Sequence, residues 1–245
     1  IILEKGFEKT VIQAYGVKEG FKDGTVVSRT FTERTSDTYN IYFGQLHSHT
    51  SYSDGAGTAQ EAFEHASNVK NLDFLAVTDH SNSFDNEANA SIGDGSMSEE
   101  WKELKGLAKE YTTTDFAGLY GYEMTWSNGL GHINTFNTPG FQSRTQKEFT
   151  TYSTALQNYY EALKTQPDSI SQFNHPGTTF GDFSDFAHYD EEIDDLITII
   201  EVGNGEGAIG SSGYFPSYEY YTRALDKGWH VAPTNNQDNH KGLWG

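Results

Sequence analysis

From Tyr39 onward, short apolar runs of strand length alternate with longer runs of helical periodicity. The strand-like runs lie at 41–46, 73–77, 117–122, 132–136, 169–173, 196–202 and 230–234. Capping boxes and one-sided apolar patterns predict the helices between them; the capping boxes are Thr58-x-x-Glu61 and Ser96-x-x-Glu99. Alternation of strands and helices is typical of an α/β fold with a parallel sheet.

The first 38 residues follow a different pattern. Two β-rich runs, 10–17 and 24–31, flank a turn region and predict a two-stranded hairpin. The stretch resembles the last strands of the β modules, of the chitobiase C-terminal or fibronectin-type-III-associated kind, that precede catalytic domains in secreted bacterial proteins. We therefore expect a hairpin segment or the remnant of an upstream β module at 1–38, and the main domain at 39–245.

Composition narrows the possible partners. Sixteen Lys and Arg against 35 Asp and Glu give a formal net charge of −19, so we expect no nonspecific binding to nucleic acid. No apolar run reaches the roughly 18 residues of a membrane-spanning helix, so we expect no membrane insertion. The absence of cysteine, the acidic composition and the β-module resemblance favour an extracellular or cell-surface bacterial location, with the cytoplasm as the alternative.

Histidines and carboxylates gather at the ends of the predicted strands. With no cysteine, any metal must be held by such side chains. Residues i and i+2 of a strand project from one face, so His47 and His49 point the same way. The carboxyl ends of the strands of a parallel barrel converge on one mouth. Six histidines and three carboxylates exceed the needs of one ion and suit two or three; they are His47, His49, Asp54, His80, Glu123, His132, His175, Asp238 and His240.

These motifs resemble those of the PHP (polymerase and histidinol phosphatase) superfamily of metallohydrolases. The matching elements are His47-x-His49, Thr78-Asp79-His80, Gly131-His132, Asn174-His175-Pro176 and Asp238-x-His240, together with Asp54 and Glu123. The stretch 44–244 is most similar to the CehA/McbA-like branch. The resemblance implies a distorted (β/α)7, TIM-like barrel and a di- or trinuclear centre. The family usually continues with another strand and helix, so we expect a C-terminally truncated domain.

The same resemblance assigns a role to each of the nine positions. The first metal takes His47, His49, Glu123 and Asp238, the second takes His132 and His175 with Glu123 as a bridge, and the third takes His80, His240 and Asp54. Some members of the family have histidine where this chain has Asp54. A mixed set of imidazoles and carboxylates favours zinc, manganese or iron over magnesium or calcium. Asp79 is expected to support the strand end rather than to bind metal.

The leading hypothesis is a phosphoesterase acting on a small anionic or ester substrate, either a phosphomonoester or a phosphodiester. A metal-bridged hydroxide would attack phosphorus. Glu123 would fix the spacing of the metals, Asp238 would accept a proton, and His188 is a candidate acid for the leaving group. One alternative is a carbamate, ester or amide hydrolase on the same centre, and another is a noncatalytic surface module with structural metal. The sequence predicts no oligomeric state.

Overall fold

The computed structural model describes residues 10–22, 24–31, 41–69, 72–85 and 90–245, in two compact units, Ile1–Ile41 and Tyr42–Gly245. In the first unit, β1 (Thr10–Ala14) pairs antiparallel with β2 (Val27–Phe31), and Thr10 lies opposite Phe31. The predicted hairpin is therefore present. The parts of segment 1–38 at 1–9, 23 and 32–38 lie outside the described residues.

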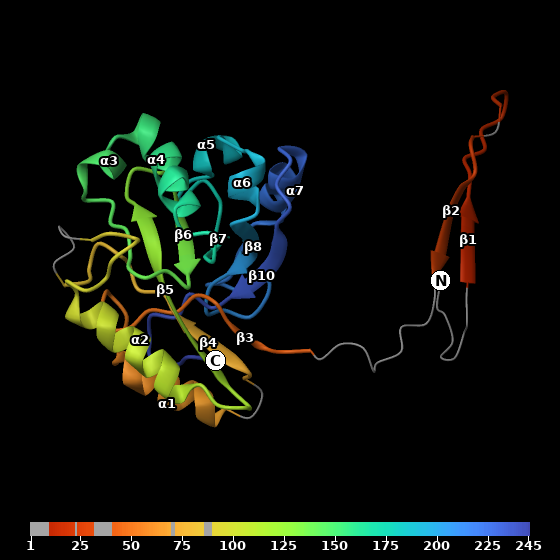
Figure 1. Ribbon diagram of the computed structural model, residues 1–245. Helices are drawn as coiled ribbons and strands as arrows, with labels where there is room; N and C mark the ends of the chain where they lie inside the picture. Colours follow the sequence, from red (N-terminus) through yellow and green to blue (C-terminus); the bar gives the residue numbers. More distant parts are fainter. Residues whose placement is uncertain (1–9, 23, 32–40, 70–71, 86–89) are drawn as a thin grey trace. The chain divides into compact units, whose positions relative to one another are not determined.

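The second unit is built on one curled sheet, which forms its centre in Figure 1. The strands follow the order β10-β8-β7-β6-β5-β4-β3, and β9 pairs with β8. Their bounds are β3 (Gly44–Gln45), β4 (Phe74–Val77), β5 (Ala117–Trp126), β6 (Gly131–Phe136), β7 (Ile170–Asn174), β8 (Ile197–Asn204), β9 (Phe215–Pro216) and β10 (Ala232–Asn236).

Strand β6 corrects the prediction of a parallel sheet. It runs antiparallel to both β5 and β7, whereas the other adjacent strands from β3 to β5 and from β7 through β8 to β10 are parallel. The reversal has a consequence for the predicted ligands. His132, near the start of β6, lies opposite Thr125 and Asn174 at the carboxyl ends of β5 and β7.

The two edges of the sheet meet at the end that carries these residues. Ser48, just beyond β3, forms a parallel bridge with Asn239, just beyond β10. The backbone N–H of Leu46 donates to Oδ1 of Asn236 over 2.8 Å, and Gln237 N–H donates to Oε1 of Gln45 over 2.8 Å. The predicted fold class is therefore confirmed as a mixed α/β fold with a distorted, TIM-like sheet.

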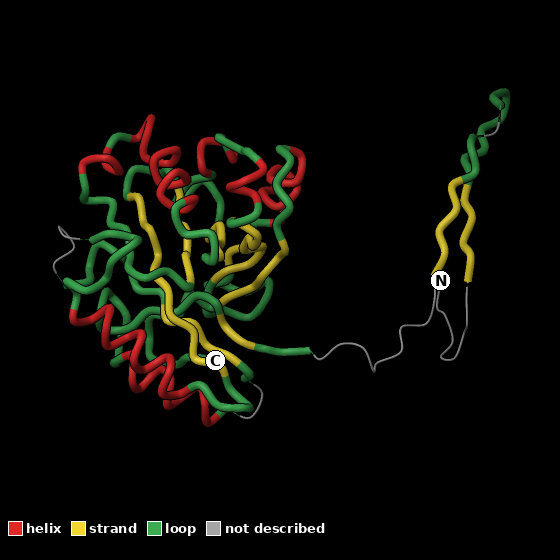
Figure 2. The backbone as a smooth tube through the Cα atoms, viewed as in Figure 1, coloured by secondary structure: helices red, strands yellow, loops and turns green. Residues whose placement is uncertain are grey.

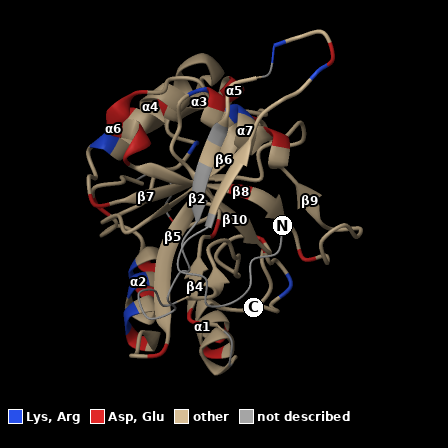
Figure 3. Ribbon diagram, turned by 90° about the vertical axis from the view of Figure 1, so that its right-hand side faces the viewer, with Lys and Arg blue, Asp and Glu red and all other residues tan. Residues whose placement is uncertain are grey.

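The helices cover the outside of the curled sheet, as the tube in Figure 2 shows. Helices α1 and α2 pack against β4 and β5, and α6 and α7 pack against β8. The ribbon segments coloured for Lys, Arg, Asp and Glu lie mainly on the helices and loops in Figure 3. Within the described ranges, no helix has the length and apolar character needed to cross a membrane. The bounds are α1 (Ala59–Asn68), α2 (Glu99–Tyr111), α3 (Lys147–Thr150), α4 (Tyr152–Lys164), α5 (Phe183–Phe186), α6 (Glu191–Asp194) and α7 (Tyr218–Asp226).

Alternation along the strands separates an apolar layer from a polar interior. On β5, Met124 belongs to the hydrophobic core, whereas its neighbours Glu123 and Thr125 are hydrogen-bonded to each other and to the site. On β7, Phe173 is in the core, and Gln172 and Asn174 are buried among polar partners. Since successive side chains point to opposite faces, one strand supplies both layers.

Several element boundaries differ from the prediction. The first strand is only Gly44–Gln45, which pairs with Phe74 and Leu75 of β4, and the preceding Tyr42 and Phe43 are exposed. Helix α2 is capped by Ser98, whose Oγ accepts the N–H of Trp101 over 3.0 Å, so Ser96 is not the N-cap. The capping box of α1 is confirmed, with Thr58 and Glu61 bonded in both directions.

That capping box gives a direct test of the α1 boundary. Replacing Thr58 by Ala leaves the N–H of Glu61 without its side-chain acceptor, and we expect unfolding to become easier by about 1 kcal/mol. Chemical denaturation of the variant measures this loss. Gln60→Ala, at an exposed position of the same helix, serves as the control and should be close to neutral. Equal effects in the two variants would contradict the capping role.

Candidate metal centre

The structure brings all nine predicted ligand residues together with one further carboxylate, Glu201. Among the described residues they form four overlapping groups, in each of which one potential ligand atom per residue lies within 4.8 Å of the others. The groups are His47, His49 and Asp238; Glu123, His132 and His175; His49, Asp54, His80 and His240; and His47, His175 and Glu201. Such overlap is typical of a site for more than one ion.

The innermost group joins the end of β3 to the end of β10. Nε2 of His47 and Nε2 of His49 lie 3.2 Å apart, and Oδ1 of Asp238 is 3.2 and 3.0 Å from them. Both imidazoles are fully buried. The i, i+2 spacing brings the ring nitrogens of His47 and His49 together, and the segment after β10 brings the carboxylate of Asp238 to the same point.

Glu123 lies between the groups. Its Oε1 is 3.2 Å from Nε2 of His47, 3.3 Å from Nδ1 of His132 and 3.4 Å from Nε2 of His175. Its Oε2 is 2.6 Å from Nδ1 of His80. A carboxylate with two oxygens that face different histidines has the geometry of a bridge between ions.

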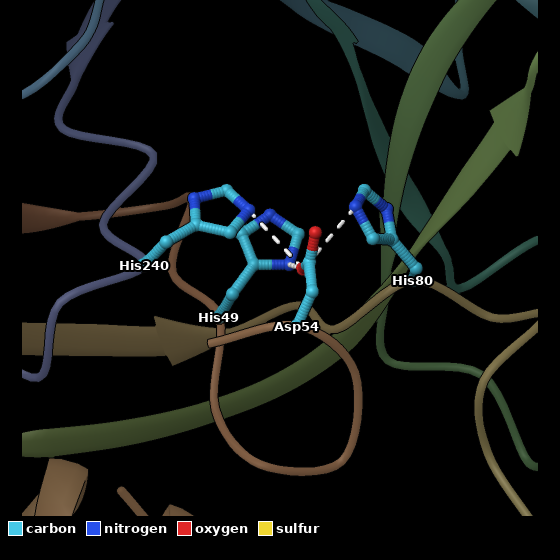
Figure 4. A group of neighbouring side chains, drawn as sticks. All are labelled: His49, Asp54, His80 and His240. Carbon is cyan, nitrogen blue, oxygen red and sulfur yellow. Dashed lines mark ion pairs between the residues drawn. The ribbon is translucent and has the colours of Figure 1, made fainter. Parts of the chain in front are cut away.

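The third group lies nearest to solvent and is drawn in Figure 4. Oδ1 of Asp54 is 3.2 Å from Nε2 of His240, 3.5 Å from Nε2 of His80 and 3.9 Å from Nδ1 of His49. The side chain of Asp54 is 62% exposed, whereas that of His49 is fully buried. An ion in this group would therefore be open to water on one side.

Glu201 was missed in the sequence because it sits within the apolar run 196–202. It is fully buried on β8, and its Oε1 lies 2.9 Å from Nδ1 of His47. A charged residue inside a buried strand is costly unless it is paired, and this was the signal that could have revealed it.

Asp79 has the supporting role that was expected of it. Its Oδ1 accepts the backbone N–H groups of Thr50 and Ser53 over 2.8 and 3.1 Å, and its Oδ2 accepts the hydroxyl of Thr50 over 2.7 Å. The carboxylate therefore holds the loop that follows His49. It belongs to none of the four groups found in the described part of the chain.

His188 is not brought into the centre. It is exposed and lines a surface pocket with Gln157, Glu161 and Asp190, on the helical layer. It belongs to none of the four groups in the described ranges. The prediction that His188 protonates a leaving group therefore has no geometric support, because the loop after β7 carries it outward.

Unusual backbone conformations occur at two of the predicted ligands. His175 has φ 27° and Asp238 has φ 50°, in the left-handed region that non-glycine residues rarely occupy. Gly131, next to His132, has φ 131°, and a Cβ there would lie 2.3 Å from the ring of Phe183. Strained backbone of this kind concentrates at functional sites, where the surrounding structure holds it.

The carboxylates of the centre are stabilised in their charged form. Burial alone would raise the pKa of Glu123, but the charges of His132 and His47 outweigh it and hold the pKa well below its usual value. Burial would also raise the pKa of Asp238, but His47 and His49 hold it below its usual range. Both groups are therefore anionic at neutral pH and suited to bind cations.

The histidines divide between two states. Burial lowers the pKa of His49 and of His132. Burial would also lower the pKa of His47, but Asp238, Glu201 and Glu123 outweigh it and raise the pKa. For His80, Glu123 and Asp54 overcome the same effect and raise the pKa to about 10. Without metal, protons on some rings thus partly balance the buried carboxylates.

The donor set fits metal ions. Within the described part of the chain, three buried atoms of these residues have no hydrogen-bond partner: Nδ1 of His132, Nδ1 of His175 and Oδ1 of Asp238, although the first forms an ion pair with Glu123 and the last forms ion pairs with His47 and His49. A buried polar atom left unpaired costs about 1–3 kcal/mol, which a bound cation would remove. In the described part of the chain, no Lys or Arg pairs with Glu123 or Asp238, so their ion pairs are with histidines alone.

An open pocket of about 750 Å³ adjoins the centre. Asp238 and His240 line one side, and the glycine-rich loop 205–213 and Phe215 line another. Lys241 also lines it, but its ammonium group is paired with Glu206. Elsewhere in the centre, the half-exposed ring of Phe180 lies beside His132 and His175. The distances from its centroid to the centroids of the two imidazole rings are 5.0 and 4.6 Å.

Sequence comparisons give no relative, since no protein-family model and no curated protein match the chain. Among solved structures, it is similar to a two-domain protein from Bacteroides vulgatus containing a predicted PHP-like metal-dependent phosphoesterase. The identity is 18% and the TM-score 0.48, and the match covers 81% of this chain and 52% of that one. The chain thus spans about half of that protein.

Two further structures are similar at the same distant level. One is described as a supposed metal-dependent phosphoesterase from Bifidobacterium adolescentis, with 14% identity, a TM-score of 0.48 and coverage of 81% and 88%. The other is an amidohydrolase from Chromobacterium violaceum with bound sulfate and no metal, with 15% identity, a TM-score of 0.44 and coverage of 80% and 87%. Similarities this distant do not assign an activity to the chain.

Removal of metal should destabilise the protein. Buried carboxylates paired only with histidines repel one another, and a bound cation relieves that repulsion. We expect the chelator-treated protein to unfold at a lower temperature than protein with zinc or manganese at 100 times its dissociation constant, a gain of about 2.7 kcal/mol per site. Differential scanning calorimetry measures the shift. An unchanged transition in the presence of either ion would contradict a metal centre.

Metal binding should also release protons. Ligands must be deprotonated, and the raised pKa values of His47 and His80, about 10 for the latter, mean that protons compete with metal below that pH. Competition weakens as pH rises, so we expect zinc affinity to increase from pH 6 to pH 9. Titration calorimetry in buffers of different ionisation enthalpy measures the protons released. Affinity independent of pH over this range would contradict the assignment.

Proposed function

We propose that the chain is a metal-dependent phosphoesterase that hydrolyses small phosphomonoesters or phosphodiesters at a di- or trinuclear centre. The observation that supports this most directly is Glu123, whose two oxygens face histidines of all three predicted metal sites. The open pocket beside Asp238 and His240 leaves space for a substrate next to the same groups. A purely structural metal site is usually a closed tetrahedron of four side chains, unlike this arrangement.

The proposed ligands keep the three-site division. His47, His49 and Asp238 would hold one ion and His132 and His175 a second, with Glu123 between them. Asp54, His80 and His240 would hold a third with more access to water. The imidazole-rich donor set favours zinc, manganese or iron as occupants.

Each residue then has a defined task. When bound, the ions would neutralise charge on the phosphoryl group and lower the pKa of attacking water. Glu123 fixes the distance between the two inner sites, and Thr125 supports it by a 2.9 Å hydrogen bond to Oε2. Asp238 would accept a proton, because it lines the open pocket and its Oδ1 lies 3.2 and 3.0 Å from the ring nitrogens of His47 and His49.

A substrate panel tests the proposed reaction. We expect metal-loaded protein to hydrolyse p-nitrophenyl phosphate or bis(p-nitrophenyl) phosphate faster than an aryl carbamate. Two or more cations stabilise the negative charge of a phosphoryl group, whereas the carbonyl group of a carbamate is uncharged. Release of nitrophenolate or of the phenol measures the three rates. If the protein hydrolyses the carbamate but neither phosphate ester, the phosphoesterase proposal is wrong, and the same centre would instead belong to a carbonyl hydrolase.

Replacement of His47 by Ala separates catalysis from folding. We expect activity to fall by more than the roughly 10–100-fold typical of residues that only support a ligand, while circular dichroism stays native. His65→Ala, at an exposed position of α1, is the control and should keep full activity. If His47→Ala fails to fold, the structural-metal hypothesis gains at the expense of the catalytic one.

A further inference from the structure

Glu201 occupies the middle of the polar interior, and its Oε1 has three nitrogen neighbours. Nδ1 of His47 lies 2.9 Å away, Nδ2 of Asn236 donates over 3.0 Å and Nε2 of Gln172 over 3.2 Å. The carboxylate is fully buried. No Lys or Arg pairs with it in the described ranges, where its one ion pair is with His47.

The second oxygen is also surrounded by donors. Oε2 of Glu201 accepts the backbone N–H of His175 over 2.8 Å and the side-chain amide of Asn204 over 2.9 Å. An ionised carboxylate offers about four acceptor positions, and five nitrogen groups occupy them. Although His47, His175 and Glu201 are close enough to surround an ion, Glu201 has no free position for one.

The hydrogen bond to His47 decides which ring nitrogen is free. A neutral imidazole has one N–H and one lone pair. If Nδ1–H donates to Glu201, the lone pair is on Nε2. That atom lies 3.2 Å from Nε2 of His49, from Oδ1 of Asp238 and from Oε1 of Glu123. The carboxylate thus directs the free nitrogen of His47 toward the other ligand atoms.

The same carboxylate restrains a second ligand residue. The N–H held by Oε2 belongs to His175, whose backbone has φ 27° and needs support from its surroundings. One buried group on β8 therefore fixes the ring of His47 and the main chain of His175, residues that are 128 positions apart in the sequence.

We infer that Glu201 is the positioning residue of the metal centre, acting through His47 and His175 without binding metal itself. The inference rests on the proposed metal centre but not on the identity of the substrate. Carboxylates that accept the second N–H of a metal-binding histidine typically change metal affinity by about 10–100-fold when replaced. A carboxylate that merely fills the polar interior would affect stability without a selective effect on metal affinity.

Glu201→Gln is the informative variant because it keeps the size of the side chain. One of its atoms becomes an NH2 donor, which must face donors from His47, Asn236 and Gln172 at one position or from His175 and Asn204 at the other. We expect zinc to bind at least about tenfold more weakly. Competition with a chromophoric chelator measures the affinity, and elemental analysis counts the ions retained.

Thr135→Val provides the matched control. Oγ1 of Thr135 is buried and hydrogen-bonded to the hydroxyls of Tyr159 and Ser171, so its loss should lower stability. Thr135 contacts no predicted ligand through these bonds, and we expect unchanged zinc affinity. Equal weakening of zinc binding in both variants, or wild-type affinity in Glu201→Gln, would overturn the inference.

Nuclear magnetic resonance of wild-type protein with 15N-labelled histidine gives a test that needs no folded Glu201 variant. The signals of His47 are assigned as those that disappear from the spectrum of the His47→Gln variant. In wild-type protein with zinc bound, these signals should show that the proton of His47 is on Nδ1. A proton on Nε2 would overturn the inference. Wild-type protein that binds no zinc would instead remove the proposed metal centre, so the two failures are distinguishable.

Discussion

Three buried carboxylates in one polar interior are the constraint on which the rest of the structure depends. Glu123 and Glu201 are fully buried, and Asp238 is largely so. In the described part of the chain, none of them is paired with Lys or Arg. Buried charge of one sign is tolerated only with compensation. Imidazoles, amides and, by our proposal, metal ions provide it.

The curled sheet makes this concentration of charge possible. Strand alternation places apolar side chains such as Met124 and Phe173 under the helices and leaves their neighbours for the interior. The hydrophobic layer therefore packs under the helices while the polar layer carries the site. The interior can then be specialised for binding, with amides such as Asn174, which donates to Oε1 of Glu123 over 2.8 Å. Because one face of each strand packs in the hydrophobic core, its other face can carry buried charged groups that are unfavourable for folding.

Much of the candidate site could be predicted because its signal is local. His47 and His49 lie two residues apart at the end of an apolar run, and that spacing alone determines a shared direction. Thr58 and Glu61 likewise define a helix start within four residues. The predicted alternation of strands and helices placed the remaining predicted ligands at one end of the sheet, including His132, although its strand runs in the opposite direction to the one assumed.

Other features could not be read from the sequence, for physical reasons. An apolar pattern carries no strand direction, so the reversal of β6 was invisible. Glu201 was concealed within a run of buried residues, and its partners outside β8 come from β7, β10 and the segments that follow β3 and β7. His188 was misplaced because a loop residue has no periodicity to show which way it faces. The direction of β6, the partners of Glu201 and the placement of His188 all depend on contacts between residues far apart in the sequence, rather than on local propensity.

The central claim is that several ions share the groups around Glu123. Anomalous difference maps from crystals of the metal-loaded protein, collected at the absorption edge of the metal identified by elemental analysis, test it most directly. The account predicts two or three peaks, each bordered by ring nitrogens, with Glu123 contacting more than one. A single ion enclosed by four side chains, or no peak near Glu123, would contradict it.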